Sequence, residues 1–289
     1  MSSHQPSKIK VHGHRGCRAL FPENTLPAFE KAIDLGVDAI ELDIAITKDN
    51  EVVVSHEPFM SRTICQKPNG QDIPESEDMM FNLYKMSHAE IKAFDCGSKE
   101  HPSYPEQIKM KAYKPLLNEV FDLVISKGSQ VRFNIEIKSK LEYYGIYTPH
   151  PNKYVTLVLQ TIKSYDFNNR CNLQSFDLDI LEEIKCQDPD MTIALLIDEN
   201  ECIEDKLKKL SFKPDIISPY FKLLTKAKVK LYQSQNYRVI PWTINEDTHL
   251  KRTKSFGVNA IITDYPHLLI ELLKQETFQQ VIKKNMHFL

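Results

Sequence analysis

The sequence predicts an α/β protein whose fold is a TIM barrel with a segment inserted after the second strand. Three observations predict it. Short β-rich runs alternate with helical patterns along the 289 residues, which is typical of a parallel sheet covered by helices. Eight β/α units fit a chain of this length. One long segment interrupts the alternation. An open, doubly wound sheet is the alternative, but no Gly-x-Gly-x-x-Gly turn follows any predicted strand.

Nine runs rich in apolar and β-branched residues are the predicted strands. We treat the third run as an extension beside the second strand, which leaves eight strands for the barrel. In chain order the runs are residues 9–14, 39–46, 52–56, 131–138, 171–176, 192–197, 216–220, 238–244 and 260–263.

Apolar residues at helical spacing predict the helices between these strands. Leu26, Phe29 and Ile33 form one apolar stripe, and Gly36 is expected to end that helix. Residues 276–289 have helical apolar spacing too, and this tail could cover the barrel bottom or contact a partner. The other predicted helices are residues 116–125, 152–165, 178–185, 201–210, 223–235, 247–256 and 267–275.

Two segments of the chain resemble each other. Residues 35–43, LGVDAIELD, and residues 256–264, FGVNAIITD, share a helix-ending Gly, an apolar strand and a closing Asp. The likeness fits two equivalent corners of one barrel, although a chance match of nine residues is the alternative.

Residues 59–114 interrupt the alternation of strands and helices. The segment is rich in Pro and polar residues and has few strand signals. A loop this long is uncommon unless it is functional or forms a small subdomain. We therefore predict a single domain over residues 1–289, with residues 59–114 as an insertion that rises over the face where barrel active sites lie.

The composition is that of an ordinary globular protein. Lys and Arg number 37 against 39 Asp and Glu, which favours neither nucleic-acid binding nor an anionic membrane surface. No apolar run approaches the roughly 20 residues of a membrane span. The polar start lacks the apolar stretch of a signal peptide, so we predict a cytoplasmic protein, although a secreted chain without its leader would look the same. The oligomeric state is not predicted.

The cysteines are expected to be reduced thiols with a structural role. They form no Cys-x-x-Cys pair and no zinc-binding spacing, and disulfides or metal ligation are the alternatives. The six are Cys17, Cys65, Cys96, Cys171, Cys186 and Cys202.

Carboxylates stand in predicted strands where their neighbours should be buried. Residues two apart on a strand share a face, so Glu41 and Asp43 point one way, as do Asn134, Glu136 and Lys138. Three carboxylates converging at strand ends would repel one another, and a divalent cation would remove that conflict. An all-oxygen set suits Mg²⁺ or Ca²⁺. A salt-bridge network and solvated strand ends are the alternatives.

Other polar residues lie at or after predicted strand ends. His14 and His56 could serve as acid and base because histidine titrates near neutral pH, and a structural role is the alternative. Arg15 could clamp a phosphate or pair with a carboxylate. Trp242, the only tryptophan, could line a ligand site or the barrel core. His12 is given no role.

Taken together and in order, these clusters resemble the glycerophosphodiester phosphodiesterase family. The matching text is HGHRGCRALFPENTLPAFEKAIDLGVDAIELDIAITKDNEVVVSHEP, followed by FNIEIK, LQSF, PWTIN and ITDYP. The match extends from about residue 9 to residue 272. Each piece alone is weak, but the motifs at these intervals are jointly very specific.

The resemblance implies a TIM barrel with an inserted segment that hydrolyses small-molecule glycerophosphodiesters to glycerol 3-phosphate and an alcohol. It implies one divalent cation, Mg²⁺ or Ca²⁺. In the family's proposed chemistry the free glycerol hydroxyl attacks phosphorus, and water opens the resulting cyclic phosphate. By position, the catalytic pair would be His14 and His56; the metal ligands Glu41, Asp43 and Glu136; the phosphate-contacting cations Arg15 and Lys138; and the substrate-lining aromatic Trp242.

Departures from the family pattern concern fine positioning. Glu57 stands where an Asp usually follows the second histidine, which puts the positioning of His56 in doubt. A phospholipase-type barrel and a glycosidase using Glu41 and Glu136 are alternative enzymes, but the glycosidase leaves the histidines without a role. A catalytically inactive scaffold predicts gaps in the catalytic set, and none is found. The alcohol head group is not predicted.

Overall fold

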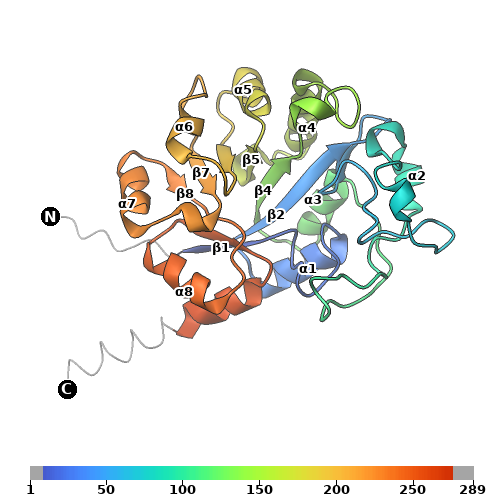
Figure 1. The fold of residues 1–289 in the computed structure, drawn as a ribbon, viewed down its shortest axis with the longest axis horizontal. Coiled ribbons are helices and arrows are strands. Elements are labelled where there is room, and N and C mark those ends of the chain that lie inside the picture. Colours follow the sequence, from blue (N-terminus) through green and yellow to red (C-terminus); the bar gives the residue numbers. More distant parts are fainter. Residues whose placement is uncertain (1–8, 276–289) are drawn as a thin grey trace.

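The computed structural model describes residues 9–275. Figure 1 shows central strands enclosed by helices. Eight of the strands are parallel, in the order β8-β7-β6-β5-β4-β2-β1-β9. The prediction of a TIM barrel is confirmed, and the predicted tail helix, residues 276–289, lies outside the described residues. The strands are β1 (Lys10–Gly13), β2 (Ala39–Ile46), β3 (Val52–Val54), β4 (Arg132–Ile137), β5 (Cys171–Ser175), β6 (Ile193–Ile197), β7 (Ile216–Pro219), β8 (Arg238–Val239) and β9 (Ala260–Thr263).

Backbone hydrogen bonds from residues in and just before β9 to residues in and just after β8 close the barrel. The amide of Asn259 donates to the carbonyl of Val239 at 3.0 Å, and the amide of Ile262 donates to that of Pro241 at 3.0 Å. The strand predicted over residues 238–244 is shorter than expected, because Pro241 has no N–H to continue a ladder.

The third predicted run belongs beside the second strand, as expected. β3 pairs with β2 in antiparallel register, with Ile44 opposite Val54 and Ile46 opposite Val52. This hairpin lengthens one side of the barrel at the point where the insertion begins.

The helices between the barrel strands follow the predicted order and differ mainly at their ends, whereas α2, in the insertion, was not predicted. α1 ends where Gly36 adopts φ 78°, as the apolar stripe predicts. α7 begins later than expected because the Thr225 hydroxyl accepts from the amide of Lys228 and caps the helix there. Residues 266–275 are helical as well. The named helices are α1 (Leu26–Leu35), α2 (His88–Lys92), α3 (Leu117–Ser126), α4 (Pro151–Ser164), α5 (Leu178–Gln187), α6 (Ile203–Leu207), α7 (Lys226–Ser234) and α8 (Asp247–Ser255).

The insertion, residues 59–114, packs around a second hydrophobic cluster, separate from the main core between sheet and helices. Ala45 of β2 and Val53 of β3 belong to this second cluster, so the insertion rests on the hairpin. In Figure 1 the segment that carries α2 lies to one side of the barrel, beyond β2.

One prediction about the cysteines is wrong. Cys65 and Cys96 form a disulfide across the insertion, 31 residues apart in sequence. The pairing depends on how the insertion folds back on itself, where Gln66 and Asp95 form a bridge between neighbouring backbone segments. Spacing along the chain carries no sign of it. Cys17, Cys171, Cys186 and Cys202 are free.

Among the residues that the structure describes, no helix is both long enough and apolar enough to span a bilayer.

Candidate active site

A cavity of about 190 Å³ opens where the carboxyl ends of the barrel strands meet, and we call it the acidic cavity. Seven of the eight site residues predicted from sequence line it, and the eighth, Asp43, pairs with two of them. The insertion contributes no lining residue. Those that line the cavity are His14, Arg15, Arg18, Glu41, His56, Glu136, Lys138, Gln174, Phe176, Leu196, Trp242, Thr243 and Ile262.

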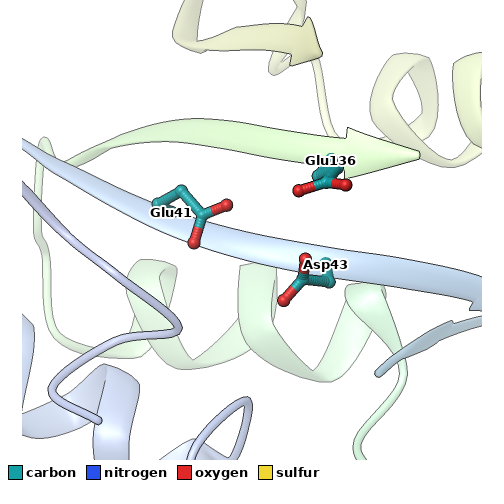
Figure 2. Close-up of side chains that lie close together, drawn as sticks. All are labelled: Glu41, Asp43 and Glu136. Carbon is teal, nitrogen blue, oxygen red and sulfur yellow. The ribbon is translucent and has the colours of Figure 1, made fainter. Parts of the chain in front are cut away.

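The three predicted metal ligands form one cluster. Glu41 and Asp43 project from β2, and Glu136 comes from β4, where it is the register neighbour of Asp43. One carboxylate oxygen from each lies within 4.8 Å of the others. All three side chains are buried, and Figure 2 shows them grouped around a common space. The geometry therefore follows from residue alternation on two adjacent parallel strands.

The cluster is short of positive charge. Burial, followed by the charges of Asp43 and Glu136, raises the pKa of Glu41 well above its usual range. Burial also raises the pKa of Glu136, and Asp43 adds to the effect although Lys138 opposes it. A divalent cation would relieve this repulsion, and three carboxylate groups fit a hard ion that prefers oxygen. In addition, the buried Oε1 of Gln174 lacks a hydrogen-bond partner beside Glu41, to which its Nε2 donates at 3.0 Å.

Arg15 enters the cluster through a strained turn. It has φ 48°, and Gly16 follows with φ 87°, a conformation that favours glycine. The turn lets the amide of Arg15 donate to Oε2 of Glu41 at 3.1 Å. The guanidinium lies 3.3 Å from Oδ2 of Asp43 and donates to Oε1 of Glu23 at 2.6 Å.

Lys138 supplies the second cation. Its Nζ lies 2.7 Å from Oε1 of Glu136 and 3.7 Å from Oδ1 of Asp43. Burial would raise the pKa of Asp43, but Arg15, His56 and Lys138 together hold it below its usual range. The salt-bridge network that sequence left as an alternative is therefore present within the same cluster as the candidate metal ligands.

His14 is held by a carboxylate that sequence reasoning missed. Its Nδ1 lies 2.6 Å from Oδ1 of Asp264, and its Nε2 lies 3.9 Å from Glu41. Asp264 also accepts hydrogen bonds of 2.6 Å from the hydroxyl of Tyr104 and from Nδ2 of Asn245. The signal was the closing Asp of FGVNAIITD, which mirrors Asp43 in LGVDAIELD. Tyr104 comes from the insertion, where no periodic pattern marks it.

His56 has its own carboxylate. Its Nδ1 lies 2.6 Å from Oε1 of Glu57, so the glutamate at the usual Asp position reaches the ring. The pKa of Glu57 is lowered: burial opposes this, but the hydrogen bond and charge of His56 outweigh it. Both histidines thus have a carboxylate on Nδ1.

Two further polar residues escaped sequence reasoning as contacts. Glu23 pairs with Arg15 and also lies 2.5 Å from Nε of Arg18. Nδ2 of Asn24 donates to Oδ2 of Asp43 at 2.9 Å. Both residues lie in the turn PENT, where their long-range partners could not be read from sequence.

Trp242 forms part of the apolar wall. Its Nε1 donates to the carbonyl of Ser218 at 2.8 Å, which fixes the ring. Phe176 meets it edge-on with ring centroids 5.6 Å apart. The cavity thus combines a charged floor with an aromatic side.

Comparison with known proteins places the chain in a family. The model of the glycerophosphoryl diester phosphodiesterase family matches residues 14–268. The chain belongs to this family. A glycerophosphodiester phosphodiesterase of Caldanaerobacter subterraneus is 32% identical over 272 residues, covering 93% of this chain and 99% of that protein. Lysophospholipase D GDPD1 of Homo sapiens is 26% identical, covering 90% of this chain and 84% of its own length.

Solved structures of similar proteins share the fold. A putative glycerophosphoryl diester phosphodiesterase from Silicibacter pomeroyi has a TM-score of 0.86 and 27% identity, covering 94% of this chain and 95% of its own. A phosphodiesterase from Oleispira antarctica, solved with the product sn-glycerol-3-phosphate, has a TM-score of 0.72 and 21% identity, covering 92% of this chain and 96% of that one. The barrel of this family member is thus a shared framework.

Proposed function

We propose that this protein hydrolyses glycerophosphodiesters to glycerol 3-phosphate and an alcohol with the help of one divalent cation. The observation that carries the proposal is the convergence in and beside one cavity of three buried carboxylates, two cations and two histidines, each histidine with a carboxylate on Nδ1. Family membership and the names of the relatives support the substrate class.

The candidate ligands for the cation are Glu41, Asp43 and Glu136. A bound Mg²⁺ or Ca²⁺ would neutralise charge on the phosphate and favour the ionised form of a nearby hydroxyl. Both ions bind carboxylate oxygens, so adding each ion back after chelation must decide between them.

The proposed acid–base pair is His14 and His56. In the first step the free glycerol hydroxyl attacks phosphorus, one histidine takes its proton, and the other donates a proton to the departing alcohol oxygen. The new bond joins the glycerol oxygen to phosphorus, and the bond to the alcohol breaks. In the second step water opens the cyclic phosphate, and the two histidines exchange roles.

Other side chains would hold the substrate. Arg15 and Lys138 stand beside the carboxylate cluster, where they could contact phosphate oxygens. Trp242 and Phe176 offer an apolar wall to the carbon atoms of the substrate. A glycosidase would use two of the carboxylates but would leave both histidine–carboxylate pairs idle.

Turnover of a substrate panel tests the proposal. Glycerophosphodiesters of choline, ethanolamine, glycerol and inositol are supplied separately, and glycerol 3-phosphate is measured with and without chelator. We expect product from at least one diester, loss of product with chelator, and recovery on adding Mg²⁺ or Ca²⁺. Activity that survives complete metal removal would contradict the metal-dependent mechanism. Hydrolysis of glycosides but not diesters would favour the alternative enzyme.

The cytoplasmic location stays a prediction. The disulfide between Cys65 and Cys96 argues against it, because disulfides persist mainly in oxidising compartments. Counting free thiols in the protein isolated from its native cells, without reductant, tests the two readings.

A further inference from the structure

A second cavity, of about 350 Å³, lies at the amino ends of the barrel strands, and we call it the basal cavity. It shares no lining residue with the acidic cavity. Its charged and ionisable lining residues are Lys10, His12, Asp38, Arg132 and Arg238.

Residue alternation explains why the space exists. On β4, Arg132 lies four residues before Glu136 and shares its face, so one strand supplies a cation to the basal cavity and a carboxylate to the acidic one. Ala39 of β2 and Ala260 of β9 line the basal cavity. Their short side chains leave room at its centre.

Three cations surround this space, and Asp215 attracts one of them, Arg238, without forming an ion pair with it. Within residues 9–275, the side chains of Lys10, Arg132 and Arg238 make no ion pair and no hydrogen bond, and all three residues are exposed. The two nearby carboxylates each accept a hydrogen bond from a backbone amide. Oδ2 of Asp38 accepts from Val11 at 2.8 Å, and Oδ2 of Asp215 accepts from Ile193 at 2.9 Å.

Like charges act on one another at this end of the barrel. Burial lowers the pKa of Arg238, Asp215 opposes the shift, and Arg132 adds to it. Only Asp38 among the lining residues carries a negative charge. An anion that bound between the two guanidinium groups would relieve their repulsion.

A buried polar atom also lacks a partner here. His12 is 6% exposed, and its Nδ1 makes no hydrogen bond. Burial, followed by the charges of Lys10, Arg238 and Arg132, lowers its pKa to about 3, so the ring is neutral near pH 7. A buried polar group without a partner is costly, and a ligand oxygen or hydroxyl in the cavity would satisfy it.

We propose that the basal cavity binds a small phosphate dianion, either inorganic phosphate or a phosphate monoester. Two guanidinium groups suit tetrahedral oxygens because each can donate two hydrogen bonds in a fork. The volume falls within the range of small-molecule sites. The proposal does not depend on the proposed function, since it concerns the opposite end of the barrel.

Calorimetric titration of the full chain tests the site. Inorganic phosphate and methyl phosphate are titrated separately at constant ionic strength, with chelator present so that no metal attracts phosphate to the acidic cavity. We expect saturable binding at one site per chain. Equal affinities would show that inorganic phosphate alone satisfies the site. Tighter binding of methyl phosphate would show that the site prefers a phosphate monoester.

Variants at each cavity locate the binding. Arg132→Gln and Arg238→Gln should each weaken the affinity by about tenfold or more, equivalent to one charged contact. Arg252→Gln, an exposed change on α8, and Lys138→Gln in the acidic cavity should leave it unchanged. Both cavity arginines are exposed, so their replacement should not disturb folding, which circular dichroism verifies.

Three results would overturn the proposal. The first is no detectable binding to the wild-type chain. The second is an equal loss in Arg238→Gln and Arg252→Gln, which means general attraction to surface charge. The third is loss of binding in Lys138→Gln alone, which places the anion in the acidic cavity.

Discussion

The two ends of the barrel carry the same residue types in opposite arrangements. At the carboxyl end, acids are buried and cations lie against them; at the amino end, cations are exposed and the nearest acids are engaged by backbone amides. His14 and His12 illustrate the difference. They stand two residues apart on one face, yet Asp264 holds the first and nothing within residues 9–275 bonds Nδ1 of the second. The chemistry of a histidine here is set by its partner.

The largest expected effect tests whether the partnered histidine is catalytic. His14→Ala should lower diester turnover by about 100- to 10,000-fold, the usual contribution of an acid or base. His12→Gln should leave turnover within about twofold, because it lies at the other end of the barrel and acts on stability. Steady-state rates of both purified variants measure this. Wild-type turnover in His14→Ala would remove the acid–base assignment.

Removing one candidate ligand tests whether that carboxylate binds a metal ion or is only a buried charge. Glu136→Gln should raise the cation concentration needed for half-maximal activity by at least about tenfold, because one charged oxygen donor is lost. Glu142→Gln, an exposed change, is the matched control. A metal titration of activity gives the answer, and unchanged midpoints in both variants would exclude Glu136 as a ligand.

His12 should affect how the free energy of unfolding depends on pH. The pKa of His12 is lowered to about 3 in the folded chain, so the unfolded chain binds the proton first as pH falls below about 6.5. The contribution of this ring to the free energy of unfolding is fully present above that pH, and it is about 2 kcal/mol smaller at pH 5. Urea unfolding of wild type and His12→Gln from pH 7 to pH 5 measures it. Parallel losses in both proteins would contradict the assignment.

The smallest expected effect concerns Tyr104 of the insertion, which is hydrogen-bonded to Asp264, the carboxylate that holds His14. Tyr104→Phe removes the 2.6 Å hydrogen bond to Asp264 and should lower turnover about three- to tenfold, equivalent to roughly 1 kcal/mol. Tyr265→Phe is the control, since Tyr265 lies near Tyr104 and none of the hydrogen bonds described for Asp264 involves its hydroxyl. Kinetics with each variant distinguish the two, and equal turnover would show that the tie is dispensable.

Local patterns in the sequence predicted the barrel well. Strand and helix periodicities are short-range signals, and Gly36 ends its helix as expected. The disulfide was missed because Cys65 and Cys96 meet through the path of the insertion. The strand near Pro241 was overextended because apolar composition outweighed the missing N–H.

For the site, alternation on β2 and β4 brought Glu41, Asp43 and Glu136 together, and the other predicted residues reach the same place from the segments that follow strand ends. Their roles remain proposals. The missed contacts are those between distant segments: Asp264 with His14, and Glu23 with Arg15. Each pair becomes neighbours only in the closed barrel. The closing Asp of FGVNAIITD marks Asp264 as a strand-end acid, but it does not identify His14 as the partner.

The insertion has its own hydrophobic cluster, which rests on the β2–β3 hairpin, and its Tyr84 also packs against the main core. For protein engineering, residues 59–114 are therefore a part that could be exchanged between relatives without rebuilding the barrel. A donor segment would still have to bring a hydroxyl to the place of Tyr104, since otherwise Asp264 would lose a donor. Diversification of this loop is thus free at its outer rim and constrained where it meets the barrel. The constraints there are Tyr104, His101 beside Glu23, and Gln107, which donates to the carbonyl of Arg18.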